Sequence, residues 1–263
     1  MVKTLVAIEV DLASSFAVRF ACQLGNLIQL EIHPIYVKIP PVEIPMTGVG
    51  WVRHTWEQEV VKAGREEIKE VLASESESCP ILQEPRVIYG DREIELLHVV
   101  EQEPFDLYVE GEPYPFTPAT IYKRLHARFY QHLPCPLVWL RGVRKIDRVA
   151  VWCADPECAG ALVETLGRLF KGSPVPLHLA YPESAEGGFD MREVARKAEA
   201  DLRSLGCQAV LEGALAPEAA GPLADFLKES GLVAMALKRG LKKDDPQLAW
   251  LAQVTAPLML VLV

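Results

Sequence analysis

Charged side chains gather after two apolar runs of the sequence, where they could hold a ligand. Leu5–Ile8 is followed by the carboxylates of Glu9 and Asp11, and a later run is followed by a basic segment. That segment supplies four cations, from Lys238, Arg239, Lys242 and Lys243. Since open α/β sheets bind ligands beyond the carboxyl ends of their strands, the basic segment is a candidate anion site. A solvated basic turn, neutralised by Asp244 and Asp245, is the alternative.

The elements that would position these residues occur twice. An apolar opening run, residues 6–9, returns as residues 149–152, and each half closes on a proline-led apolar run, at 134–140 and 257–263. A repeat of this length is a duplicated domain, because solenoid periods are much shorter. We place the two domains at residues 1–143 and 144–263.

Apolar runs alternate with stretches of helical spacing in both halves. This alternation predicts parallel strands joined by right-handed helical crossovers, so each half should be a doubly wound α/β sandwich. Asp155-Pro156, Ala216-Pro217 and Asp245-Pro246 are typical of helix starts, with proline at the first helical position. Prolines and glycines in residues 40–50 predict a loop.

The composition excludes several classes of protein. Of the net charge of −9, the first half carries −7 and the second −2, which disfavours nucleic acid and anionic membranes as partners. No apolar run is long enough to span a bilayer, and the start of the sequence does not resemble a signal peptide. Six scattered cysteines in such a chain favour free thiols in a reducing cytoplasm. The spacing of Cys153 and Cys158 fits neither zinc nor redox motifs, and we expect no metal site.

The sequence resembles the universal stress protein family in its tandem two-domain form. The resemblance rests on the opening strand, a histidine in the second strand (His33), Gly90-Asp91, the run Asp106–Gly111, and Pro134–Val138. It implies two tandem doubly wound domains, each with a five-stranded parallel sheet of order 3-2-1-4-5. It also implies that the two fifth strands pair within one chain, and further homodimer formation stays open.

ATP-binding members of that family have an Asp after the first strand and a glycine-rich loop, Gly-x2-Gly-x9-Gly-Ser/Thr, after the fourth. Here Glu9 and Trp152 stand at the Asp positions. Gly111 matches the first glycine, but Tyr114 replaces the second, and Lys123-Arg124 and Asp244-Asp245 end the two loops. A nucleotide such as ATP is therefore not expected in the standard geometry, because glycines and helix N-termini normally cradle the phosphates.

The fourth-strand loop of the first half, residues 111–116, is acidic and stiffened by proline. In the family fold Glu9 and Asp11 lie near it, so a cation or an amine could bind there. A rigid loop with one or two aromatic side chains packed onto the protein is the alternative.

Three functions follow. The first is a cytoplasmic, stress-response or regulatory protein that acts by binding a protein partner and is not an enzyme. The second is a nucleotide or small-anion sensor with a remodelled crevice in the second domain. The third is an enzyme related to nucleotide-dependent α/β hydrolases or transferases, and the sequence contains neither a Gly-x-Ser-x-Gly elbow nor a phosphate-binding P-loop to support it.

Overall fold

The computed structural model describes residues 1–40, 51–76, 79, 81–183, 188–216 and 222–263. Residues 41–50 of the predicted proline-rich loop lie outside this range. The same holds for Pro217, at which one helix was predicted to begin.

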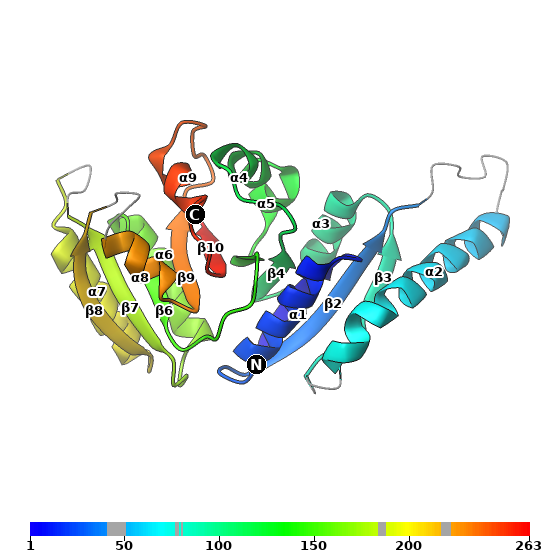
Figure 1. The fold of residues 1–263 in the computed structure, drawn as a ribbon, viewed down its shortest axis with the longest axis horizontal. Coiled ribbons are helices and arrows are strands. Elements are labelled where there is room, and N and C mark those ends of the chain that lie inside the picture. Colours follow the sequence, from blue (N-terminus) through cyan, green and yellow to red (C-terminus); the bar gives the residue numbers. More distant parts are fainter. Residues whose placement is uncertain (41–50, 77–78, 80, 184–187, 217–221) are drawn as a thin grey trace.

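Both halves alternate strands and helices (Figure 1). The first half contains β1 (Val2–Ile8), α1 (Leu12–Gly25), β2 (Leu30–Lys38), α2 (Trp51–Ser76), β3 (Arg86–Tyr89), α3 (Arg92–Gln102), β4 (Leu107–Gly111), α4 (Pro118–Leu125), α5 (Arg128–His132) and β5 (Leu137–Leu140). The second half contains β6 (Val149–Trp152), α6 (Pro156–Leu169), β7 (Pro176–Pro182), α7 (Met191–Ser204), β8 (Gln208–Leu215), α8 (Pro222–Lys228), β9 (Leu232–Leu237), α9 (Pro246–Leu251) and β10 (Leu258–Leu262).

The strands form one ten-stranded sheet of order β3-β2-β1-β4-β5-β10-β9-β6-β7-β8. Within each half the strands are parallel and follow the predicted order 3-2-1-4-5. The halves meet where β5 and β10 pair antiparallel, with Val138 opposite Met259. The predicted fold class is confirmed, and the pairing of the fifth strands within the chain joins the two predicted sheets into one.

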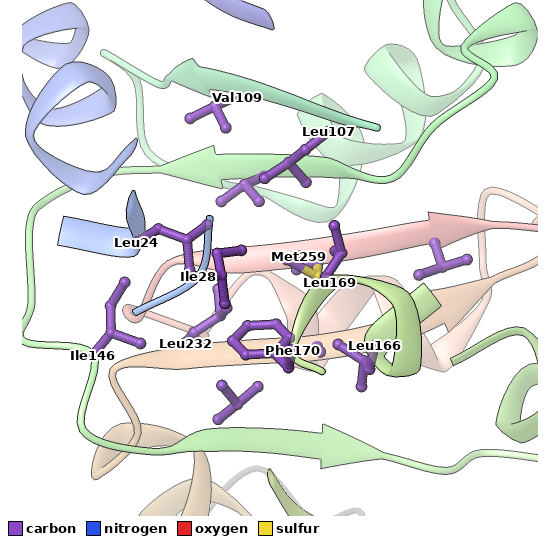
Figure 2. Close-up of a cluster of buried hydrophobic side chains, with 14 of the residues drawn as sticks. Leu24, Ile28, Leu107, Val109, Ile146, Leu166, Leu169, Phe170, Leu232 and Met259 are labelled. Carbon is purple, nitrogen blue, oxygen red and sulfur yellow. The ribbon is translucent and has the colours of Figure 1, made fainter. Parts of the chain in front are cut away.

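Helices cover both faces of this sheet, and each face joins the halves in one apolar cluster. On one face, Leu24 of α1 and Leu107 of β4 lie in the same cluster as Leu169 and Phe170 at the end of α6 (Figure 2). On the opposite face, the cluster runs from α3 through Trp139 to α9. The two halves therefore bury apolar surface against each other as well as within themselves.

Aspartates begin the helices that follow the strands. Asp11, Asp91, Asp155 and Asp245 each accept a hydrogen bond from a backbone N–H in the first helical turn. Such side chains satisfy donors that have no partner within the helix. The helix starts predicted at Asp155-Pro156 and Asp245-Pro246 are thus confirmed.

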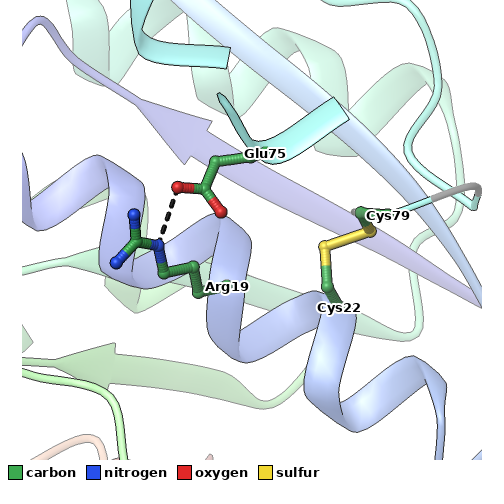
Figure 3. Close-up of a disulfide and its surroundings, with 4 residues drawn as sticks. All are labelled: Arg19, Cys22, Glu75 and Cys79. Carbon is green, nitrogen blue, oxygen red and sulfur yellow. Dashed lines mark hydrogen bonds and ion pairs between the residues drawn. A yellow bond between two sulfur atoms is a disulfide. The ribbon is translucent and has the colours of Figure 1, made fainter. Parts of the chain in front are cut away.

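The expectation that all six cysteines are free is wrong. Cys22 of α1 and Cys79, which follows α2, form a disulfide across a sequence separation of 57 residues (Figure 3). Beside it, Arg19 Nε lies 2.7 Å from Glu75 Oε1, an ion pair that also joins α1 to α2. The packing of the two helices brings the cysteines together, which their positions in the sequence did not reveal. The other four cysteines are free and buried.

Among the described residues, no helix combines the length and the apolar character needed to cross a membrane.

Candidate functional site

The strand order of the first half reverses at β1, which has β2 on one side and β4 on the other. Ligands of doubly wound sheets bind at the carboxyl edge beside such a switch. Glu9 and Asp11 follow β1 at this edge, and Gly111 ends β4 beside them. The structure therefore brings together the three candidate residues of the first half.

The centre of this edge is a buried carboxylate that the sequence analysis did not single out. The Glu110 side chain, at the end of β4, is 1% exposed. It accepts hydrogen bonds from the Tyr108 hydroxyl at 2.8 Å, from the Trp139 indole N–H at 2.7 Å, and from the Tyr130 hydroxyl. Because a buried charge is costly unless it is paired and hydrogen-bonded, this set of donors explains how Glu110 is accommodated.

Two guanidinium groups complete the surroundings of Glu110. Arg92 Nη2 lies 3.0 Å from one carboxylate oxygen, and Arg124 Nη2 lies 3.2 Å from the other. Arg92 also donates to Glu9 at 2.7 Å, and Arg124 pairs with Glu112. Three carboxylates thus pair with Arg92 and Arg124. Both cations already have partners, and neither is available to bind a phosphate.

The electrostatics of the network keep Glu110 ionised. Burial raises the pKa of Glu110, but Arg124, Arg92 and the tyrosine hydroxyls outweigh it and lower the pKa to about 2. Burial raises the pKa values of Tyr108 and Tyr130, which therefore stay protonated and donate to the carboxylate. The pKa of Glu9 is also raised by burial, which Arg92 partly offsets. This arrangement is suited to a fixed structural network and offers no unpaired nucleophile.

Gly111 and Asp11 are explained by packing and capping. A Cβ on Gly111 would lie 2.0 Å from the carbonyl oxygen of Ala13, so only glycine lets β4 approach α1 this closely. Asp11 Oδ1 accepts from the Ser14 N–H at 2.8 Å. In the neighbouring loop, the side chain of Phe116 is buried against Trp139. The alternative given for this loop, a rigid loop with one or two aromatic side chains packed onto the protein, predicts such a contact.

The corresponding position in the second half is aromatic. Trp152, at the end of β6, is 3% exposed. Its ring meets that of Trp250 from α9 edge to face, with centroids 6.2 Å apart. An indole pair therefore stands where the family pattern has an aspartate, and it supplies no group that would bind a phosphate or a metal.

The basic segment does not act as one cluster. Lys238 Nζ lies 3.3 Å from Glu157 and 4.0 Å from Asp155, at the start of α6. The carboxylates raise the pKa of Lys238, with the hydrogen bond to Glu157 as the largest cause. Lys242 and Lys243 are exposed in the turn that precedes α9.

Arg239 has a different role from the other cations of this segment. Its Nη1 donates to the carbonyl oxygens of Tyr130 at 2.7 Å and Gln131 at 2.8 Å, and its Nη2 to that of Leu133 at 2.8 Å. These carbonyls lie at the end of α5 in the first half. Arg239 thus ties the two halves together through these three hydrogen bonds.

His33 on β2 and His178, at the matching place on β7, each lie beside a glutamate. His33 lies 3.2 Å from Glu31, and His178 pairs with Glu212. Within the described ranges, no group of three or more His, Cys, Asp or Glu side chains is placed to hold a metal. Cys153 is buried, and burial raises its pKa to about 12, so its thiol is not reactive at neutral pH.

A cavity of about 300 Å³ lies at the junction of the halves, between Pro134–Pro136 and α6. Arg168 and Arg239 line it. Arg168 pairs with Asp106 at 2.8 Å, and Arg239 is held by the carbonyls of α5. Both cations that line this cavity therefore already have partners within the protein.

The signal that could have located Glu110 is its place in the sequence. A glutamate directly after the apolar run Leu107–Val109 falls on a strand that is buried on both faces. Such a carboxylate requires partners. Its partners come from α3, α4, α5 and β5, however, and their convergence depends on the tertiary fold.

No family profile matches the sequence, and a search of curated proteins also finds no match. Solved structures do match. A universal stress protein from Archaeoglobus fulgidus DSM 4304 superposes with a TM-score of 0.63 and 14% identity, over 98% of this chain and 95% of that one. A protein of unknown function from Pseudomonas aeruginosa PAO1 gives a TM-score of 0.58 and 13% identity, over 99% and 92%. A provisionally assigned universal stress protein from Pseudomonas aeruginosa UCBPP-PA14 gives the same values.

These likenesses extend over both halves of the chain and concern the fold, since the identities are low. The strand order in each half and the full-length superposition agree, and this chain has the fold of the universal stress proteins, with two such units in one polypeptide.

Proposed function

We propose that the chain is a stress-response or regulatory protein of the universal stress type, which acts by binding a protein partner without the standard ATP site and without catalysis. The observation that carries this proposal is the Glu110 network. It fills the crevice of the first half with carboxylates whose partners are the chain's own arginines. A phosphate would have to displace a carboxylate from each guanidinium group.

The second half supports the same conclusion. Trp152 and Trp250 occupy the end of the crevice, and the donors of Arg239 point to carbonyls of the first half. Lys238 is engaged by acidic side chains of α6. The anion-sensor alternative would thus rest on Lys242 and Lys243, two exposed side chains of one turn.

Cytoplasmic location stays a prediction. The Cys22–Cys79 disulfide bears on it, because structural disulfides are rare in proteins of reducing compartments. The oxidation state of these two cysteines in cell extracts quenched with a thiol-blocking reagent would test the location.

The test of the proposed function is nucleotide binding by the purified chain. A native mass spectrum should show the bare chain, and thermal unfolding should not change when magnesium ATP is added. A ligand present at about 100 times its dissociation constant would stabilise the native state by about 2.7 kcal/mol, which is roughly 5–10 °C for a chain of this size.

A bound nucleotide mass, a stability gain of that size, or turnover of ATP would overturn the proposal. If a gain is seen, Lys242→Gln with Lys243→Gln locates it. Loss of the gain in that variant would assign the anion to the second half, and its survival would assign it to another crevice.

A further inference from the structure

Large apolar side chains are exposed at one edge of the first half. Val10 and Leu12 follow β1, Ile94 lies in the first turn of α3 after β3, and Tyr114 follows β4. Their exposed fractions are 55%, 69%, 49% and 72%. Each of these residues follows the carboxyl end of a parallel strand or lies in the first helical turn after one. In the described part of the second half, Phe189 is the large exposed apolar residue at the matching edge.

Two contacts hold the segments that carry these side chains together. Arg92 Nε, in the first turn of α3, lies 2.7 Å from Glu9, next to Val10. Gly111 lies against the carbonyl of Ala13, next to Leu12. The segments that carry the apolar residues are therefore linked at Glu9–Arg92 and at Ala13–Gly111. Grouped apolar side chains of this kind on a protein surface indicate an interaction site, whereas isolated ones do not.

The same edge is strongly acidic. Near the apolar residues in sequence stand Asp11, Asp91, Glu93 and Glu95, in addition to Glu9, Glu112 and the buried Glu110, which lie against Arg92 and Arg124. The arginines are engaged by Glu9, Glu110 and Glu112. Asp91 and Glu93 are exposed, and the described residues place no cation against either of them. The surface thus combines apolar contact area with unneutralised negative charge.

From this combination, and building on the proposed function, we infer that the carboxyl edge of the first half is a docking surface for a basic amphipathic segment of a partner protein. Apolar side chains of that segment would cover Leu12, Ile94 and Tyr114. Its lysines or arginines would meet Asp91 and Glu93. Complementary charge fixes the orientation of such a segment and speeds its association.

The charge also disfavours the other occupants. Phosphate-bearing ligands and nucleic acids would be repelled by the carboxylates. A second copy of this chain would use the same patch on both partners in a twofold interface, and would place Asp91 and Glu93 opposite a surface of like charge. A cationic partner is the chemistry that this edge fits.

The test uses the full chain and a fluorescein-labelled helical peptide of leucine and lysine, with the leucines on one face. The control peptide has glutamate in place of every lysine. Fluorescence anisotropy should show that the wild-type chain binds the basic peptide and not the acidic one, and that binding weakens at high salt because exposed charges are screened.

Variants locate the binding. Leu12→Ser with Tyr114→Ser should weaken the basic peptide about tenfold, a loss of about 1.4 kcal/mol, and Glu93→Lys should weaken it further. Phe189→Ser, on the second half, is the matched control and should leave the affinity unchanged. The altered side chains are exposed, so thermal unfolding should be that of the wild type and loss of fold would not explain the result.

Equal affinity for both peptides, unchanged affinity in the double variant, or an equal loss in Phe189→Ser would overturn this surface. Self-association of the wild type that the double variant abolishes would also overturn it in favour of a second copy. If the basic peptide does not bind and no nucleotide binds either, the inferred docking surface is refuted, whereas the proposed function is not. Stabilisation by nucleotide would contradict the proposed function itself.

Discussion

The disulfide between Cys22 and Cys79 should contribute a large share of the stability of this chain. Its removal by Cys22→Ala with Cys79→Ala frees a loop whose ends are 57 residues apart in sequence. In the chain-entropy account, closing such a loop removes about 14 cal/mol/K from the unfolded state, or about 4 kcal/mol at 25 °C. For a chain of this size that change corresponds to roughly 10 °C in unfolding temperature.

Equilibrium unfolding in urea, followed by far-UV circular dichroism, measures this difference. The wild type without reductant should unfold at a higher urea concentration than the double variant. Reductant should move the wild type to the midpoint of the variant. It should leave the variant unchanged, because Cys135, Cys153, Cys158 and Cys207 are free thiols already.

Two results would refute the reasoning. If a mass spectrum of the alkylated, unreduced chain shows six modified cysteines, the bond does not form. If the bond forms but the midpoints with and without reductant coincide, loop closure does not stabilise the native state. In that case the Arg19–Glu75 ion pair, which joins the same two helices, would be sufficient to hold α2 in place.

Three further predictions concern the packing of the candidate site. Glu110→Gln should lower the free energy of unfolding by about 3 kcal/mol at pH 7, because it removes the buried charge that pairs with both Arg92 and Arg124. The difference in unfolding free energy between the wild type and this variant should be largest above pH 4.5, the ordinary pKa of a glutamate. It should vanish as the pH falls towards about 2, the pKa of Glu110 in the folded protein. A difference that grows on acidification would contradict the negative charge assigned to Glu110. Gly111→Ala should cost about 1–3 kcal/mol in urea unfolding, since its Cβ meets a backbone carbonyl, whereas Gly240→Ala, where no atom lies within 4 Å of the new Cβ, should change little. Arg239→Ala should cost about 2–4 kcal/mol because three carbonyl oxygens lose their donor, and Lys238→Ala should leave the urea midpoint almost unchanged; equal effects of the two would contradict the role given to Arg239.

The sequence was sufficient to predict the fold because the fold depends on local patterns that occur twice. Short apolar runs that alternate with helical spacing require parallel strands and crossovers, and Asp-Pro pairs show where helices begin. The pairing of β5 with β10 followed from the resemblance to a known family, and the structure shows that it is antiparallel. It places Val138 against Met259, a pairing that neither closing run specifies by itself.

The site was harder to predict because its interactions are long-range. Glu110 finds Arg92, Arg124 and Tyr130 only when α3, α4 and α5 have packed on the sheet. Arg239 belongs to a basic segment by its sequence, yet its partners lie more than a hundred residues away. Local composition predicted an anion site there, whereas tertiary contacts assign the guanidinium group to the joint between the halves.

The continuous sheet has a consequence for how the two halves can change over evolutionary time. In a symmetric dimer of identical chains, every substitution appears on both sides of the interface, so the two partners cannot differ. Here β5 and β10 belong to one polypeptide, and a substitution affects one half alone. One half can therefore carry an indole pair where the other carries a carboxylate network, and the assembled molecule offers each surface once. A partner that recognises one half therefore finds a single matching surface on each polypeptide.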